Sequence, residues 1–121
     1  MRTVMTPDKR LVESAAVHCA TGLPMRGYEI HIGRTEGADC ARPFARIGGR
    51  PEGAGSPDGR VTGSYLHGMF ADDGFRAAYL RGLGAEASGL AYAAGVETVL
   101  DAMADHLEAH LDVPGLLALA V

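Results

Sequence analysis

Alternating apolar and polar residues predict three strands in the first two thirds of the chain. The clearest alternation lies in MRGYEIHIGRT, whose two faces carry Tyr28, Ile30 and Ile32 and, opposite them, Glu29, His31 and Gly33. RLVESAAVHCATG, from Arg10 to Gly22, alternates more weakly, and RVTGSYLHG resumes an extended pattern from Arg60 to Gly68. Between them, residues 48–59 hold five glycines and two prolines, which predicts an exposed loop without a regular element.

Helical spacing replaces this alternation after residue 70. Asp72 and Asp73 suit a helix start, and Gly84 is a natural stop for the apolar residues Phe75, Ala78, Tyr79 and Leu83. A second, longer helix is predicted to end at Pro114, and its apolar stripe comprises Val96, Val99, Leu100, Met103, Leu107 and Leu111. The apolar ending LLALAV must pack against something, inside this chain or outside it.

The order strand, strand, loop, strand, helix, helix indicates an α/β fold. At 121 residues the chain is long enough for one domain and one core. Three strands make a thin sheet, and two helices cover only part of it, so the chain reads as one end of a larger α/β domain.

Composition and charge narrow the class of protein. The chain is 47% apolar and 21% charged, which indicates a globular protein. No run approaches the roughly 20 apolar residues of a membrane span, and the first residues do not resemble a secretory signal, so a cytoplasmic protein with no membrane partner is expected. The net charge of −4, with no basic stripe, gives nucleic-acid binding little support.

His67, in GSYLHGMF, is the leading candidate for chemistry. It closes a predicted strand before a glycine and a helix, where open α/β sheets place their active-site crevice. Gly63, Ser64 and Gly68 leave room for a substrate, and a neutral imidazole can accept and return a proton near pH 7. A strand-end histidine bonded to the backbone is the alternative interpretation.

The other candidates are weaker. Glu29 and His31 share a strand face, where they could orient an imidazole, bind a polar substrate group, or simply face solvent. A metal site from His31, His67 and Cys40 has no spacing signature, and the two cysteines form no disulfide framework. His106 and His110 suit the negative end of a helix dipole. Neither Cys19, inside a predicted strand, nor Cys40, in a polar stretch, sits on the glycine-flanked turn that presents a nucleophile.

The stretches RGYEIHIGRTEG, PFARI and DGRVTGSYLHGMFADDGFRAAYLRGLG together resemble the C-terminal part of the cobyric acid synthase family. TPDKRLV and ADHLEAHLD fit the same pattern, so the resemblance spans nearly the whole chain. These proteins are glutamine-dependent amidotransferases of cobalamin biosynthesis. Their amidotransferase domain is of the class I-like, triad type, which implies part of an open, flavodoxin-like sheet followed by C-terminal helices.

The resemblance implies a cysteine and histidine pair, in which the cysteine attacks the glutamine amide and His67 passes the proton to the departing ammonia. A proline and a ring-orienting glutamate usually follow this histidine, but Gly68 and Met69 stand here, so a dyad is expected. Tyr28, Glu29 and His31 would support the site or bind substrate. No cofactor or metal is expected in residues 1–121.

The nucleophile half and the ATP-dependent synthetase domain of the family are expected to lie outside residues 1–121, which alone should be inactive. In the whole enzyme, ammonia from glutamine would amidate a corrinoid with ATP and Mg²⁺ at the other domain. Two alternatives stay open. One is a cobyrinic acid a,c-diamide synthase or a related ligase, and the other is a non-catalytic module that docks on a partner or self-associates through exposed apolar surface.

Overall fold

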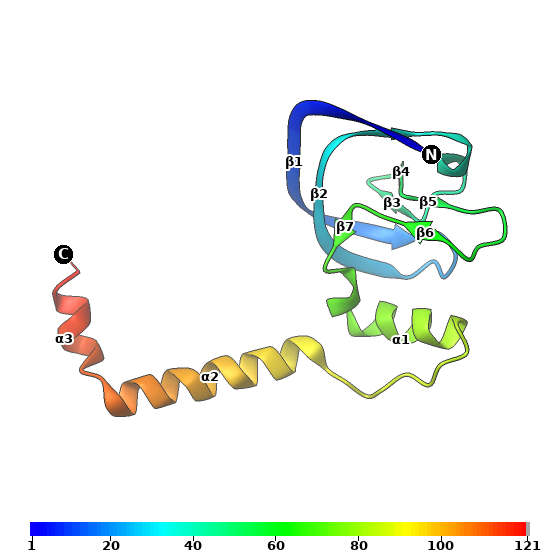
Figure 1. Cartoon of the computed structure of the whole chain (residues 1–121). Coiled ribbons are helices and arrows are strands. Elements are labelled where there is room, and N and C mark those ends of the chain that lie inside the picture. Colours follow the sequence, from blue (N-terminus) through cyan, green and yellow to red (C-terminus); the bar gives the residue numbers. More distant parts are fainter. Residues whose placement is uncertain (121) are drawn as a thin grey trace. The chain divides into compact units, whose positions relative to one another are not determined.

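The computed structural model describes residues 1–120, and the chain divides at Gly89 and Leu90 into two compact units (Figure 1). Among the described residues, the strands and the first helix lie in the first unit, and the regular elements of the second unit are helices. The hydrophobic core of buried residues lies within residues 1–89, from Ala16 to Phe75 in sequence.

A long, curved hairpin dominates the first unit. β1 (Arg2–His18) and β2 (Pro24–Glu36) pair in antiparallel fashion along most of their length and bend together (Figure 1). The five residues between them reverse the chain, and Gly22 takes a left-handed φ of 69° that favours glycine. Both predicted strands exist, but β1 begins eight residues before the predicted start and ends before Cys19.

The remaining strands are short and add to the edges of the hairpin. They are β3 (Ala45–Ile47), β4 (Arg50–Glu52) and β7 (Leu66–His67), which with the hairpin form a sheet in the order β4-β3-β1-β2-β7. Every pair in this sheet is antiparallel. The expected flavodoxin-like sheet, whose strands are largely parallel, is therefore wrong for this chain. Short turns join β1 to β2 and β3 to β4, and such turns can connect only antiparallel neighbours.

The predicted loop at residues 48–59 is also only partly a loop. β4 lies within it, and β5 (Ala54–Gly55) pairs there with β6 (Thr62–Gly63) as a second, two-stranded sheet. Glycines with positive φ, including Gly53 at 75°, make the turns between these strands. The predicted strand from Arg60 to Gly68 is likewise divided into β6 and β7.

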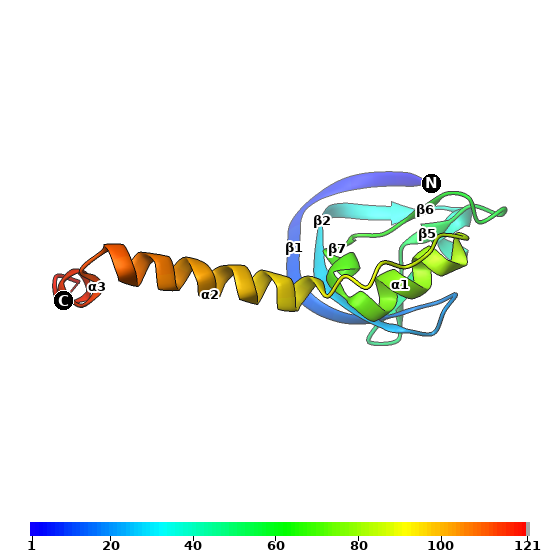
Figure 2. The same ribbon diagram turned by 90° about the horizontal axis from the view of Figure 1, so that it is seen from below.

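Helix α1 (Asp73–Gly82) begins and ends as the sequence predicts. The Asp72 carboxylate accepts the Phe75 N–H at 2.9 Å as the N-cap, and Gly84 adopts φ 80° after the last turn. Two short 3₁₀ turns, η1 (Ala38–Ala41) and η2 (Met69–Ala71), join these elements. α1 lies against one side of the hairpin (Figures 1 and 2), and the core there comprises Ala16, Met25, Phe44, Ala45, Leu66 and Phe75.

The hairpin has two faces with different surroundings. The inner face, which α1 and the β3–β6 segment cover, carries alternate residues from Arg10 to His18 of β1 and from Met25 to Gly33 of β2. The outer face carries the residues between them, and most of its large side chains are exposed. Its members are Leu11, Glu13, Ala15 and Val17 of β1 and Arg26, Tyr28, Ile30 and Ile32 of β2.

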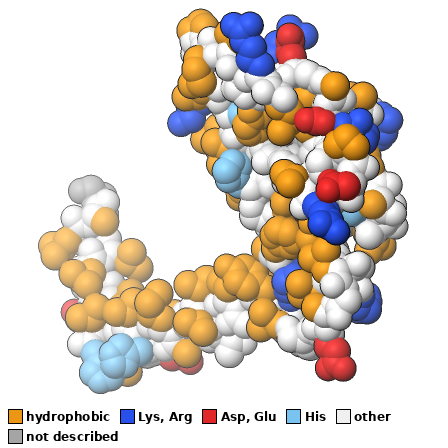
Figure 3. All heavy atoms as spheres, turned by 45° about the vertical axis from the view of Figure 1, so that its right-hand side comes forward, with side chains coloured by type: hydrophobic (Ala, Val, Ile, Leu, Met, Phe, Trp, Pro, Cys, Tyr) orange, Lys and Arg blue, Asp and Glu red, His pale blue; other side chains and the backbone are white. Residues whose placement is uncertain are grey.

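The second unit consists of α2 (Tyr92–His110) and α3 (Val113–Ala118). The long predicted helix is confirmed, but Pro114 does not simply end it, because the proline lies in the first turn of α3, where its missing N–H costs nothing. The predicted apolar stripe of α2 is exposed from Val96 to Leu107, and apolar side chains are common on this unit's surface (Figure 3). None of the described helices is long and apolar enough to cross a membrane.

Candidate functional site

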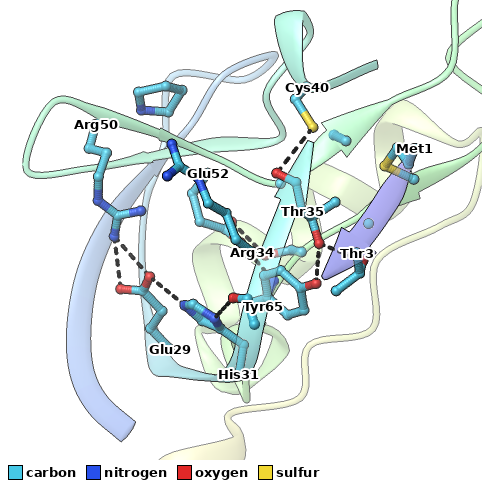
Figure 4. A pocket seen from close by; sticks show the side chains of 16 residues that line it. Met1, Thr3, Glu29, His31, Arg34, Thr35, Cys40, Arg50, Glu52 and Tyr65 are labelled. Atoms are coloured by element: carbon cyan, nitrogen blue, oxygen red, sulfur yellow. Dashed lines mark hydrogen bonds and ion pairs between the residues drawn. The ribbon is translucent and has the colours of Figure 1, made fainter. Parts of the chain in front are cut away.

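A concave pocket of about 660 Å³ lies over the inner face of the hairpin, on the part of that face that α1 does not cover. β2 forms one wall with Glu29, His31 and Thr35, and the segment from Arg50 to Ala54 forms another (Figure 4). Tyr65, just before β7, completes the lining. The predicted strand face of Glu29 and His31 is therefore not an open, solvated surface.

Glu29 is the most buried charged residue of the pocket, with 1% of its surface exposed. Its carboxylate accepts hydrogen bonds at 2.9 Å on both oxygens from one terminal nitrogen of Arg50, and the Arg10 Nε lies 2.7 Å from Oε2 (Figure 4 shows the Arg50 pair). Both arginines are about half exposed, so their remaining N–H groups reach water. The buried charge is thus paired on both oxygens.

These partners set the charge of Glu29. Burial raises the pKa of the Glu29 carboxyl, but the hydrogen bonds and positive charges of Arg10 and Arg50 outweigh burial and hold the pKa below its usual value of 4.5. Glu29 is accordingly a carboxylate at neutral pH. With its oxygens occupied by guanidinium groups, it is suited to holding β1, β2 and β4 together rather than to moving protons.

His31 is similarly engaged. Its Nδ1 lies 3.0 Å from the Gly33 carbonyl oxygen and donates to it, and its Nε2 lies 3.4 Å from Glu29 Oε1 (Figure 4). The ring stacks on Tyr65 with 4.7 Å between centroids, and the Tyr65 hydroxyl bonds to Thr35. His31 is therefore fixed within the pocket wall.

Glu52, a second buried acid, anchors the segment that carries His67. Its carboxylate accepts the Ser64 hydroxyl and the Tyr65 backbone N–H, each at 2.7 Å. Neither this role nor the pairing of Glu29 with Arg10 and Arg50 was predicted. The one available signal was the presence of acids in otherwise small or apolar stretches, and it could not identify partners 12 or 21 residues away.

His67 is not part of this pocket. It ends β7, as predicted, and pairs directly with Tyr28 of β2, while Leu66 pairs with Glu29. Directly opposed residues of two strands share a face, so His67 and Tyr28 lie on the outer face and Glu29 and His31 on the inner one. The structure thus brings His67 together with Tyr28 and Glu29 together with His31, and the sheet lies between the two pairs.

The backbone of His67 is fixed although its side chain is exposed. Leu66, 2% exposed, anchors β7 in the core, and Gly68 turns the chain away at φ 76°. On the other side, a Cβ on Gly27 would lie 2.3 Å from the His67 carbonyl oxygen, so only glycine permits this approach. Among residues 1–120, no hydrogen bond or ion pair engages the imidazole, which contradicts the interpretation of a backbone-bonded histidine.

The remaining candidates stay apart from His67. Cys19 is exposed just after β1, and Cys40 lies in η1, where its thiol is 3.9 Å from the Thr35 carbonyl oxygen. His110 donates from Nδ1 to the His106 carbonyl at 2.7 Å at the end of α2, as expected of a helix-end histidine. Across the described part of the chain, no group of three or more His, Cys, Asp or Glu side chains is placed to hold a metal ion.

Comparison with known proteins identifies a family for most of the first unit. The model of the CobB/CobQ-like glutamine amidotransferase domain matches residues 1–75, which run from the start of the hairpin to the first turn of α1. His67, Tyr28 and the inner pocket all lie within the matched residues. No solved structure matches the chain.

Curated relatives extend the likeness to the helical unit. The chain is 74% identical to a cobyric acid synthase of Cereibacter sphaeroides over 98% of its length, and 68% identical to that of Rhodobacter capsulatus over 99%. A cobyric acid synthase of Bradyrhizobium diazoefficiens is 58% identical over 99% of the chain. The chain spans about a quarter of the length of these relatives.

Proposed function

This chain belongs to the CobB/CobQ-like glutamine amidotransferase domain family, and on that premise we propose that it supplies the histidine half of a cysteine–histidine glutaminase site. The single observation that carries the proposal is the His67 imidazole. It is exposed, has no hydrogen bond or ion pair among the described residues, and is held on a fixed backbone at the sheet edge. A general base needs a free nitrogen at a defined position, and His67 meets both requirements.

The proposed reaction begins with a cysteine from a segment outside residues 1–121. His67 takes the thiol proton, the thiolate attacks the carbonyl carbon of the glutamine side-chain amide, and His67 returns the proton to the nitrogen as ammonia departs. Water then hydrolyses the thioester, with His67 taking its proton, and glutamate leaves. The chain contributes the general base, His67, and the paired strands β2 and β7 that position it.

The outer face is suited to receive the cysteine-bearing segment. Leu11, Val17, Tyr28 and Ile32 are each between 43% and 59% exposed, and they lie on the same face as His67. Exposed apolar side chains gathered on one sheet face indicate a surface that is buried by further protein. The exposed apolar face therefore favours the hypothesis that the chain is part of a larger amidotransferase, and disfavours the hypothesis of a non-catalytic module.

The names of the relatives suggest the wider reaction. By analogy with the cobyric acid synthases of Cereibacter and Rhodobacter, the ammonia would amidate carboxylates of a corrinoid in cobalamin biosynthesis, in the cytoplasm, with ATP and Mg²⁺ used at a separate domain. Cobyrinic acid a,c-diamide synthase is the alternative within the class, although the three relatives compared are all named cobyric acid synthase.

A chimera tests the proposal. Residues 1–121 replace the matching quarter of the Cereibacter sphaeroides relative, and ammonia release from glutamine is measured for the chimera and for the chain alone. The chimera should hydrolyse glutamine, and the chain alone should not. Saturable hydrolysis by the chain alone that disappears in Cys19→Ala or Cys40→Ala would overturn the proposal of an external nucleophile.

A further inference from the structure

We propose that Tyr28 forms a wall of the glutamine site, its ring packing on the methylene groups of the bound substrate. The inference rests on the proposed glutaminase function and adds to it a residue that contacts substrate. Three features of the structure lead to it: the register of β7 on β2, the edge position of β7, and the exposure of Tyr28.

The register places Tyr28 directly beside His67. The two residues are opposed across β2 and β7, so their Cβ atoms lie about 4.5–5.5 Å apart and both side chains leave the sheet on the outer face. Glycine at position 27 permits the close approach of the His67 carbonyl that this register requires, and the Ile30 N–H donates to the Tyr65 carbonyl oxygen at 3.0 Å beside it. A one-residue slip would send His67 to the opposite face.

The edge position leaves His67 one directly opposed residue among those described, Tyr28, with Arg26 and Ile30 of β2 as its diagonal neighbours on the same face. β7 ends the sheet order β4-β3-β1-β2-β7, so β2 alone pairs with it. Tyr65, two residues before His67, stacks on His31 in the inner pocket instead of flanking the imidazole. Tyr28 therefore borders one side of His67, and within residues 1–120 no strand pairs with β7 on the other side.

Substrate chemistry completes the argument. The amide nitrogen of glutamine must come within hydrogen-bond reach of His67, and two methylene groups follow that amide. A tyrosine ring mounted beside the imidazole presents an apolar surface to those methylenes. Tyr28 is 52% exposed, which leaves ring surface for a ligand to cover.

The experiment measures glutamine hydrolysis by the same chimera. Tyr28→Ala should raise KM about 15-fold with little change in kcat, because burying each of two methylenes contributes about a factor of four. Tyr28→Phe keeps the ring and should raise KM only about 2-fold. Tyr28→Leu, which preserves an apolar strand residue, should fall between them. Leu83→Ala removes a 69% exposed side chain away from the outer face and should leave both constants unchanged.

Three outcomes are decisive once each variant shows the parent melting temperature. A rise in KM that follows the loss of the ring supports the proposal. An unchanged KM in Tyr28→Ala and Tyr28→Leu overturns it, as does an equal rise in Tyr28→Phe and Tyr28→Ala, which would assign the effect to the hydroxyl. His67→Gln is run in parallel. If that variant stays active, the proposed function fails, whereas a dead His67→Gln with an unaltered Tyr28→Ala defeats this inference alone.

Discussion

On the inner face of the β1–β2 hairpin, hydrogen bonds and ion pairs hold Glu29 and His31. On the outer face His67 and Tyr28 are exposed, and the described part of the chain makes no such bond to the His67 ring. Each face carries a histidine, His31 on the inner face and His67 on the outer face, and the difference in burial between the faces distinguishes the roles of the two residues. A carboxylate removed from water needs its charge paired, which makes the inner set structural. An imidazole without a partner at a sheet edge keeps its nitrogens available for a substrate.

The largest expected effect separates the two histidines. In the chimera, His67→Gln should lower kcat for glutamine hydrolysis by about 10²–10⁴-fold, the usual contribution of a general acid–base group. His31→Gln, on the inner face, should leave kcat close to the parent value. Steady-state ammonia release checks both variants. Equal losses in the two variants would break the distinction between the faces.

The next effect concerns the inner face. Glu29→Gln should lower the free energy of unfolding by about 2–4 kcal/mol, somewhat less than for a fully buried pair because Arg10 and Arg50 reach solvent. Glu36→Gln, on the same strand with a 70% exposed carboxylate, is the matched control and should cost less than about 0.5 kcal/mol. Urea unfolding of the chain measures both, and similar values would show that Glu29 is not a structural charge.

A smaller effect links the two faces through the backbone. Gly27→Ala places a Cβ 2.3 Å from the His67 carbonyl oxygen, so β7 must move, at a cost of about 1–3 kcal/mol. The chimera should also lose glutaminase activity, because the displaced β7 carries His67. Gly82→Ala, at the end of α1 where a Cβ meets no atom within 4 Å, is the control. Full activity in Gly27→Ala would show that the β2–β7 register does not position His67.

The smallest effect is a pH dependence that arises at His18, under α1. His18 is 5% exposed among Phe44, Phe75 and Tyr79, and burial lowers its pKa below the usual 6.5. The folded state therefore binds the proton less well than the unfolded state. Stability from this site is complete above pH 6.5 and declines as the pH falls below it.

Melting curves between pH 7.5 and 5 test this dependence. His18→Phe should flatten the decline, while His106→Gln on the exposed α2 should not. Glu29 has a lowered pKa and so acts in a different window, since its stabilisation persists until the pH falls below 4.5. A decline between pH 7.5 and 5 that survives in His18→Phe would contradict the assignment.

Local chemistry made part of this structure predictable. The Asp72 cap, Gly84 and the period-2 pattern of β2 depend on near neighbours, and each is found as predicted. The sequence does not predict the short strands β4 and β5, because they form by pairing with β3 and β6 and not through a pattern in their own glycine-rich sequence. Likewise, His67 was identified by its position at a strand end, but which face it occupies depends on a register that the sequence does not display.

The most direct test asks which face meets the nucleophile. In the chimera, His67→Cys and His31→Cys are each treated with a short thiol–thiol cross-linker, and the linked peptides are identified by mass spectrometry. With Cys40 replaced by Ser, because it lines the same pocket as His31, the account predicts a link from position 67 to a cysteine of the preceding segment and no link from position 31 to that segment. A link from position 31 and none from position 67 would contradict it and move the active site to the inner pocket.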